Sequence, residues 1–139
     1  MRLFIFVANF IINLKIPKGE FFMNKTLALC QARHNMPECV EGAIFGNTLD
    51  PLDLGGMAET VEAALDGVDE LTLYVTGLSV ALVEVIKYCE SNGVSLVLMH
   101  FNRDTGDYYP QGVCSFTPCP WCGRQMRSTD WQCPHCGGN

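Results

Sequence analysis

Residues 71–101 read LTLYVTGLSVALVEVIKYCESNGVSLVLMHF, and this stretch decides the fold. The β-branched and aromatic run 71–75 predicts a buried strand, and the Gly-containing run 76–79 predicts a turn after it. Residues 80–90 have a helical pattern that a Ser-Asn-Gly sequence ends. Residues 94–101 then predict a second apolar strand.

Two apolar strands joined by a helix predict a right-handed βαβ crossover and therefore a parallel sheet. Residues 26–30 predict an earlier strand, residues 57–65 predict an amphipathic helix, and a long connection over residues 40–53 joins them. A tight-turn sequence at residues 102–107 predicts an added hairpin. We therefore expect an α/β fold built on a small Rossmann-like βαβαβ layer with an added β-hairpin.

The chain has 139 residues, of which 48% are hydrophobic and 17% charged, and this composition is typical of a globular protein. The net charge is −6, and residues 23–113 hold four basic and thirteen acidic side chains. Such an acidic domain repels a phosphate backbone, which argues against non-specific duplex binding. Four of the eight cysteines form two CxxC pairs, while Cys30 and Cys89 lie on apolar faces. A reducing, cytoplasmic location fits this distribution.

Residues 1–22 contain an apolar run, Leu3 to Leu14, which is shorter than the ~20 residues that a membrane-spanning helix needs. No small-residue cleavage site of a signal peptide follows it. Codons for residues 18–20, Lys-Gly-Glu, can instead spell a purine-rich ribosome-binding sequence just before Met23. We therefore expect Met23 to be the native start and residues 1–22 to be a non-native leader. A native start at Met1, with a short hydrophobic membrane-associated or cleaved segment, is the alternative.

The C-terminal part contains two copies of a CPxCG motif, separated by ten residues. Each CxxC turn places two thiolates on one side of a knuckle, and two knuckles complete the tetrahedral S₄ site that suits Zn²⁺. The motif resembles that of the zinc ribbon family, which implies one structural zinc ion per chain. Its expected ligands are the four cysteines of the two motifs, Cys119, Cys122, Cys133 and Cys136. Rubredoxin knuckles are also similar, so iron is an alternative metal, and a pair of disulfides is another alternative.

Two tryptophans and two arginines belong to the same module: Trp121, Trp131, Arg124 and Arg127. They could form an aromatic and basic surface that stacks on nucleic-acid bases. The alternative is that the tryptophans cover the small core of the ribbon. His135 lies inside a knuckle, and we expect an exposed imidazole there rather than a metal ligand.

Several polar residues follow the predicted strands, at the edge where α/β sheets bind ligands. After the strand 71–75, Thr76, Gly77, Leu78 and Ser79 could cradle a phosphate, with Ser79 capping the helix. Arg33 and His34 follow the first strand, where arginine could hold a phosphate and histidine could move a proton. At the end of the third strand, His100 and Asn102 complete the candidate ligand-binding set. Ordinary capping, solvated loop side chains and a sheet-face histidine are the alternatives.

The strand that ends in Arg33-His34 is similar to the start of the histidine phosphatases, except that Asn35 stands where that family has glycine. Residues 26–111 also resemble the small CRISPR-associated Rossmann-fold (CARF-like) proteins. The features shared are Arg33-His34, residues 49–51 with the sequence Leu-Asp-Pro, and residues 77–79 opening a helix. That resemblance implies binding of a nucleotide-like anion such as a cyclic oligoadenylate. It also implies metal-independent, ring nuclease-like cleavage of a phosphodiester, with Arg33 and His34 as the catalytic residues.

The expected organisation is a leader at 1–22, the Rossmann-like α/β domain at 23–111, a linker at 112–118 and the C-terminal zinc ribbon at 119–139. We expect a prokaryotic or phage-type protein that binds, and in one version cleaves, a nucleotide-like ligand. A non-enzymatic zinc-ribbon adaptor for a protein or nucleic acid is one alternative, and a small phosphatase-like enzyme is another. We expect that the chain can form a homodimer. We do not expect a stable membrane-spanning segment.

Overall fold

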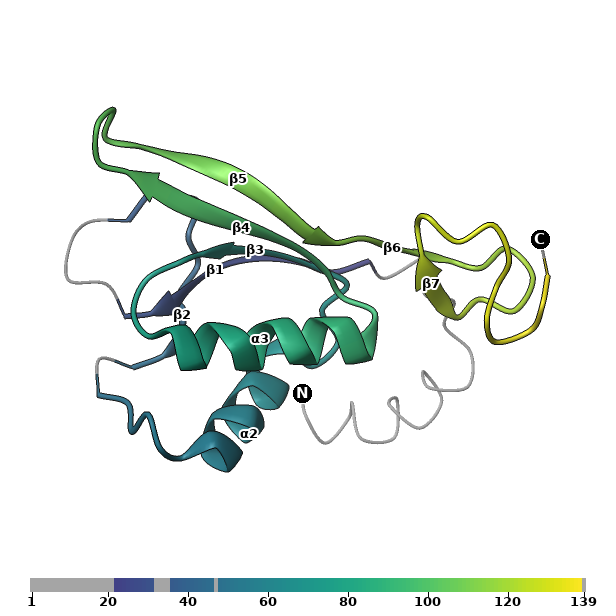
Figure 1. The fold of residues 1–139 in the computed structure, drawn as a ribbon, viewed down its shortest axis with the longest axis horizontal. Coiled ribbons are helices and arrows are strands. Elements are labelled where there is room, and N and C mark those ends of the chain that lie inside the picture. The colour runs from purple at the N-terminus through teal and green to yellow at the C-terminus, as the bar shows by residue number, and fades with distance from the viewer. Residues whose placement is uncertain (1–21, 32–35, 47, 139) are drawn as a thin grey trace, which may run out of the picture.

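The computed structural model describes residues 22–31, 36–46 and 48–138. Its five-stranded sheet has the order β2-β1-β3-β4-β5, in which only β5 is antiparallel to its neighbour, and β6 and β7 form a separate two-stranded sheet (Figure 1). The expected α/β fold with an added hairpin is confirmed. The elements in chain order are β1 (Asn24–Cys30), β2 (Ala43–Phe45), α2 (Leu54–Leu65), β3 (Glu70–Tyr74), α3 (Ser79–Asn92), β4 (Ser95–Asn102), β5 (Asp107–Cys114), β6 (Phe116–Pro118) and β7 (Gln125–Arg127).

Helices α2 and α3 cover the same face of the sheet (Figure 1). The chain steps from β2 over β1 to β3, and then from β3 to β4 in the same direction. Crossovers of one hand that step in one direction place their helices on one face. The domain is therefore a two-layer α/β unit, in which α2 packs against α3 below the strands.

The core lies between the sheet and the two helices. Leucines at alternate strand positions point into it, and each helix contributes one apolar stripe. Its most deeply buried members include Leu29, Leu71, Leu73 and Leu96 from the strands, Met57, Val61 and Leu65 from α2, and Val85 and Cys89 from α3.

Strand β2 lies inside the connection predicted over residues 40–53. It pairs in parallel with β1, with Ala43 opposite Ala28 and Phe45 opposite Cys30. Three residues are too few to show a period-two pattern, so the sequence carried no clear signal for this strand. Helix α2 begins at Leu54 because the Asp53 carboxylate accepts a hydrogen bond from the Gly56 amide at 3.0 Å.

The expectation that Met23 is the native start concerns residues 1–22, of which residues 1–21 lie outside the described residues. Across residues 22–31, 36–46 and 48–138, none of the helices combines the length and apolarity needed to cross a bilayer.

The buried thiol of Cys89 makes the stability of the protein fall at alkaline pH. Burial raises the pKa of Cys89 to about 12, whereas an unfolded cysteine ionises near pH ~8.5. Below pH 8 the thiol is protonated in both states; above that, only the unfolded state loses the proton, so stability falls as pH rises. Between pH 8 and pH 10 we expect the free energy of unfolding, measured with urea, to fall in the wild type by about 1–2 kcal/mol more than it falls in Cys89→Ala. Equal losses in the two proteins would contradict this assignment.

Candidate metal centre and the interface beside it

The two knuckles have the same backbone geometry. Gly123 has φ +78° and Gly137 has φ +76°, a left-handed conformation that residues with side chains rarely adopt. The Gly123 amide donates to the Cys119 carbonyl and the Gly137 amide to the Cys133 carbonyl, each at 2.9 Å. The glycine of each CPxCG motif therefore closes the turn that brings its two cysteines together.

Backbone amides point at the sulfur atoms. The Trp121 amide donates to Cys119 Sγ at 3.3 Å, and the His135 amide donates to Cys133 Sγ at 3.4 Å. The amides of Cys122 and Trp121 are the main reason that the pKa of the Cys119 thiol is lowered to about 6. One sulfur of the cluster is therefore ready to ionise near neutral pH.

A second thiol of the cluster shifts in the opposite direction. The Gly138 amide, 3.4 Å from Cys136 Sγ, acts to lower the pKa of Cys136. Burial and hydrogen bonds with the neighbouring thiols outweigh that amide and raise this pKa to about 11. When one of these close thiols is ionised, its negative charge opposes ionisation of the others. A bound dication neutralises that charge, because metals bind thiolates.

The four ligand sulfurs lie within 4.8 Å of one another. Cys119 Sγ is 3.7 Å from Cys136 Sγ, and Cys122 Sγ is 3.7 Å from Cys133 Sγ. A tetrahedral ion with ~2.3 Å metal–sulfur bonds needs sulfurs about 3.8 Å apart. The cluster can therefore hold one metal ion, as the spacing predicted, and the donor set suits both zinc and iron. His135 is exposed and stands outside the set, as expected.

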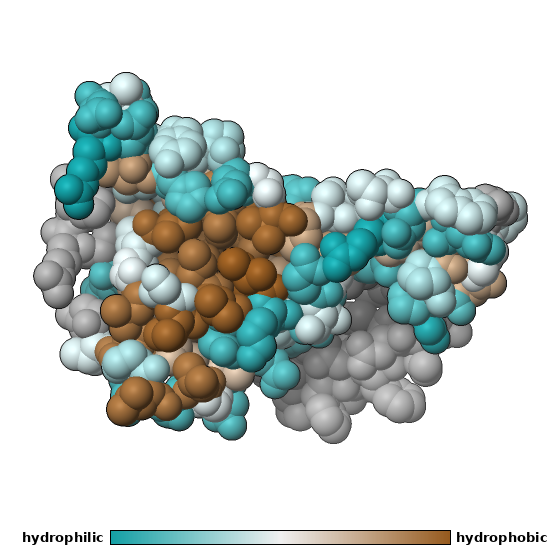
Figure 2. All heavy atoms as spheres, in the orientation of Figure 1, coloured by the Kyte–Doolittle hydropathy of each residue, from teal (hydrophilic) through white to brown (hydrophobic). Residues whose placement is uncertain are grey.

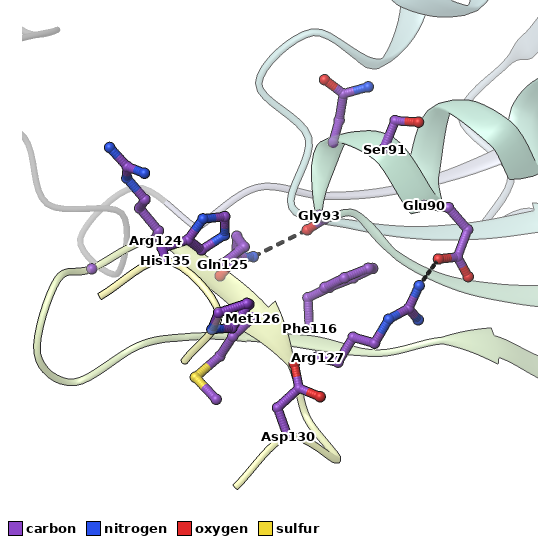
Figure 3. Close-up of a pocket in the computed structure, with 13 residues that line it drawn as sticks. Glu90, Ser91, Gly93, Phe116, Arg124, Gln125, Met126, Arg127, Asp130 and His135 are labelled. Atoms are coloured by element: carbon purple, nitrogen blue, oxygen red, sulfur yellow. Dashed lines mark hydrogen bonds and ion pairs between the residues drawn. The ribbon is translucent and has the colours of Figure 1, made fainter. Parts of the chain in front are cut away.

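The module is held against the C-terminal end of α3 (Figure 3). Gln125 Nε2 donates to the Gly93 carbonyl at 3.2 Å, and the Arg127 guanidinium forms an ion pair with Glu90. Arg127 also lies over the Phe116 ring, 5.4 Å from its centroid. Gln125 and Gly93 are 32 positions apart in the chain, and Arg127 and Glu90 are 37 positions apart. No local sequence pattern could therefore have predicted either pair.

A cleft of about 470 Å³ separates the module from the end of α3 (Figure 3). Arg124 and His135 lie on its ribbon side, and Ser91 and Asn92 on its helix side. Within the described part of the chain, the buried Gln125 Oε1 has no hydrogen-bond partner. An unpaired buried acceptor of this kind costs folding free energy.

Gly93 lies at the contact between α3 and the module. Its φ is +67°, and a Cβ added there would come within 2.7 Å of Gln125 Cβ. We expect Gly93→Ala to destabilise the protein by more than the ~1–2 kcal/mol that the left-handed conformation costs alone. Gly67→Ala is the matched control, because Gly67 has φ +78° with nothing within 4 Å of the added Cβ. Urea unfolding checks both variants, and equal losses would show that the module does not press on Gly93.

The two tryptophans are largely exposed. Trp121 is 66% and Trp131 is 76% accessible, although Trp121 lies against Gly138. Their rings therefore leave much of their surface on the outside of the module. Of the two arginines predicted to accompany them, Arg124 is exposed, whereas Arg127 is engaged by Glu90.

The structure brings the end of β1 to the turn between β3 and α3. Thr76 Oγ1 donates to the Cys30 carbonyl at 2.8 Å and accepts from the Cys30 amide at 3.1 Å. Gly77 has φ +94°, and a Cβ there would come within 2.5 Å of Cys30 Sγ. The Thr76 hydroxyl thus links the end of β1 to the turn that follows β3. The expected cap at Ser79 is wrong: Leu78 is the N-cap, without a side-chain hydrogen bond, and Ser79 is already helical.

His100 and Asn102 have local partners in the hairpin. His100 Nε2 is 2.7 Å from Gln111 Oε1, and its ring lies 5.5 Å from that of Tyr109. Asn102 Oδ1 accepts from the Asp104 amide at 2.9 Å within the turn. Arg33 and His34 lie outside the described residues, so their catalytic role stays a prediction.

Comparison of the chain with known protein families, with curated proteins and with solved structures finds no match. The fold and the cluster define the class: a mixed α/β protein with four clustered cysteines that can hold one metal ion.

Proposed function

We propose that the protein is a zinc-ribbon adaptor, in which Zn²⁺ bound by the four clustered cysteines holds a module that grips a protein partner. The observation that carries this proposal is the exposure of both tryptophans on the metal-binding module. Tryptophan is enriched among the residues that dominate binding energy at protein interfaces. A closed S₄ site leaves no coordination position for water, so the zinc is structural and the module acts by binding.

Charge favours a protein over a nucleic acid as the partner. The net charge of the chain is −6, and Arg127 already neutralises Glu90. Exposed Arg124 is the one remaining arginine on the described part of the ribbon, which is little charge with which to attract phosphates.

Affinity capture with the zinc-loaded full chain tests the proposal. We expect Trp121→Ala and Arg124→Ala to abolish capture of the partner while the metal content stays unchanged. Phe101→Ala is the matched control, since Phe101 is an aromatic residue 46% exposed on the α/β domain, outside the ribbon. Unaltered capture by the ribbon variants would contradict the adaptor function.

A titration with oligo(dT) at low salt distinguishes the nucleic-acid version. Both tryptophans of the chain lie in the module and its four tyrosines lie outside it, so selectively excited tryptophan fluorescence reports on the module. Quenching by the oligonucleotide, lost on Trp121→Ala, would assign the surface to nucleic acid instead of protein.

A second candidate is binding, and cleavage, of a nucleotide-like anion such as a cyclic oligoadenylate. One observation favours it: the ends of parallel β1 and β3 meet at the start of α3, whose N-terminus has no side-chain cap. Uncapped amides at this edge suit a phosphate. Arg33 and His34, which follow β1 in the sequence, would then hold the phosphate and move the proton.

Incubation with cyclic oligoadenylates, followed by chromatography, tests this second candidate. Cleavage that falls in His34→Ala, with circular dichroism unchanged, would support it, and neither binding nor cleavage would remove it. Hydrolysis of p-nitrophenyl phosphate tests the phosphatase version in the same preparation.

A further inference from the structure

The outer side of the helical layer is apolar at positions that a monomer would leave to water. Five large side chains there are exposed: Leu52 at 87%, Leu54 at 50%, Leu78 at 42%, Val80 at 37% and Val83 at 50%. We call these five residues the helical patch. Figure 2 shows apolar surface that runs without a large break from the first half of α3 to the start of α2.

The patch is a feature of the sequence of α3. Its inner stripe, Ala81, Val85 and Cys89, is completely buried, and Val80 and Val83 occupy the other side of the same helix. A helix that is apolar on both sides is normally covered on both sides. Contiguous apolar surface of this kind marks an interaction site on a soluble protein.

The charges around the patch are arranged in opposite signs at its two ends. Lys87 follows Val83 by one turn on the outer side of α3, toward its C-terminal end. Its ammonium lies 3.4 Å from the largely buried Glu84 carboxylate, but the Lys87 side chain is 66% exposed and can also reach a carboxylate of a partner. Asp50 and Asp53 flank Leu52 at the other end, because α2 and α3 both begin at the carboxyl edge of the parallel strands. A surface with a base at one end and acids at the other is complementary to a copy of itself turned by 180°.

We propose that the helical patch is the contact surface of a homodimer. Two copies pack α3 against α3 in antiparallel directions across a two-fold axis near Val83. Lys87 of each copy then faces Asp50 and Asp53 of the other. A lipid surface fits less well, because membrane-binding faces carry several basic residues around the apolar side chains, and Lys87 is the one base described on the outer side of α3.

Sedimentation velocity on the full chain tests the proposal. We expect a species of twice the 15.4 kDa chain mass at tens of micromolar, and a monomer for Val83→Glu. Ala63→Glu is the matched control, because it adds the same charge at an exposed position on the side of α2 opposite Leu54. A monomeric wild type, or a dimeric Val83→Glu variant, would overturn the proposal.

The charge pairs test the antiparallel arrangement. Lys87→Asp should raise the dimer dissociation constant at least tenfold, and Asp50→Lys in the same chain should restore it. A loss that the second substitution does not restore would overturn this arrangement of the two copies. The other outcome is a monomeric wild type in which Val83→Glu speeds proteolysis before residue 22. That result would mean that the chain's own residues 1–21 cover the helical patch, and the dimer would be wrong.

Discussion

Removal of the metal will unfold the C-terminal module and leave the five-stranded domain folded. Within residues 119–138 only Cys119 and Cys133 are buried, so the module has almost no apolar core of its own. Structural zinc contributes about 10–16 kcal/mol of apparent binding free energy in small zinc modules, and here that energy would be the folding energy of the ribbon. The sixteen buried apolar residues of the main core all lie before residue 99 and do not involve the metal.

Two spectroscopic signals separate the two parts of the chain. Both tryptophans belong to the module and are already largely exposed, so a chelator should lower the anisotropy of their fluorescence as the module unfolds, with little shift in wavelength. Far-UV circular dichroism should keep the signal of α2 and α3, which lie in the other part. Loss of the helical signal together with the fluorescence change would show instead that the whole chain depends on the ion.

Cys133→Ser should have the second large effect. This sulfur is buried and 3.7 Å from Cys122 Sγ, and a serine hydroxyl is a poor replacement for a thiolate ligand. We expect the metal content to fall from one ion per chain to less than one tenth at micromolar free zinc, with the tryptophan anisotropy of the metal-free protein.

Cys39→Ser is the matched control for the ligand substitution. Cys39 is an exposed cysteine outside the cluster, and its sulfur contacts Tyr74 at 3.6 Å. The variant should retain one metal ion per chain. Equal metal loss in the two variants would mean that the measured thiolate–metal binding is not specific to the cluster.

The cysteine cluster was predictable because its sequence signal is local and dense. Two CPxCG motifs name all four ligands, and the glycine after each pair explains the turn that the structure shows. The βαβ core was predictable for the same reason, since residues 71–101 contain strand, helix and strand with clear boundaries. The stop at Gly93, for example, is an observed left-handed cap.

The remaining features depend on contacts that lie far apart in the sequence. Strand β2 is held by its ladder with β1 and is too short to show a pattern. Gly77 is left-handed and Leu78 is extended, so Leu78 rather than Ser79 is the N-cap of α3. The ion pair of Arg127 with Glu90 arises only when the module folds back on α3.

X-ray absorption at the zinc edge of the purified full chain, together with metal analysis, is the sharpest test of whether the four clustered cysteines bind a structural zinc ion. We expect one zinc ion per chain with four sulfur neighbours at ~2.3 Å and no nitrogen or oxygen in the first coordination sphere. A metal-free protein with the four cysteines oxidised in pairs, or an ion with nitrogen or oxygen ligands, would contradict it.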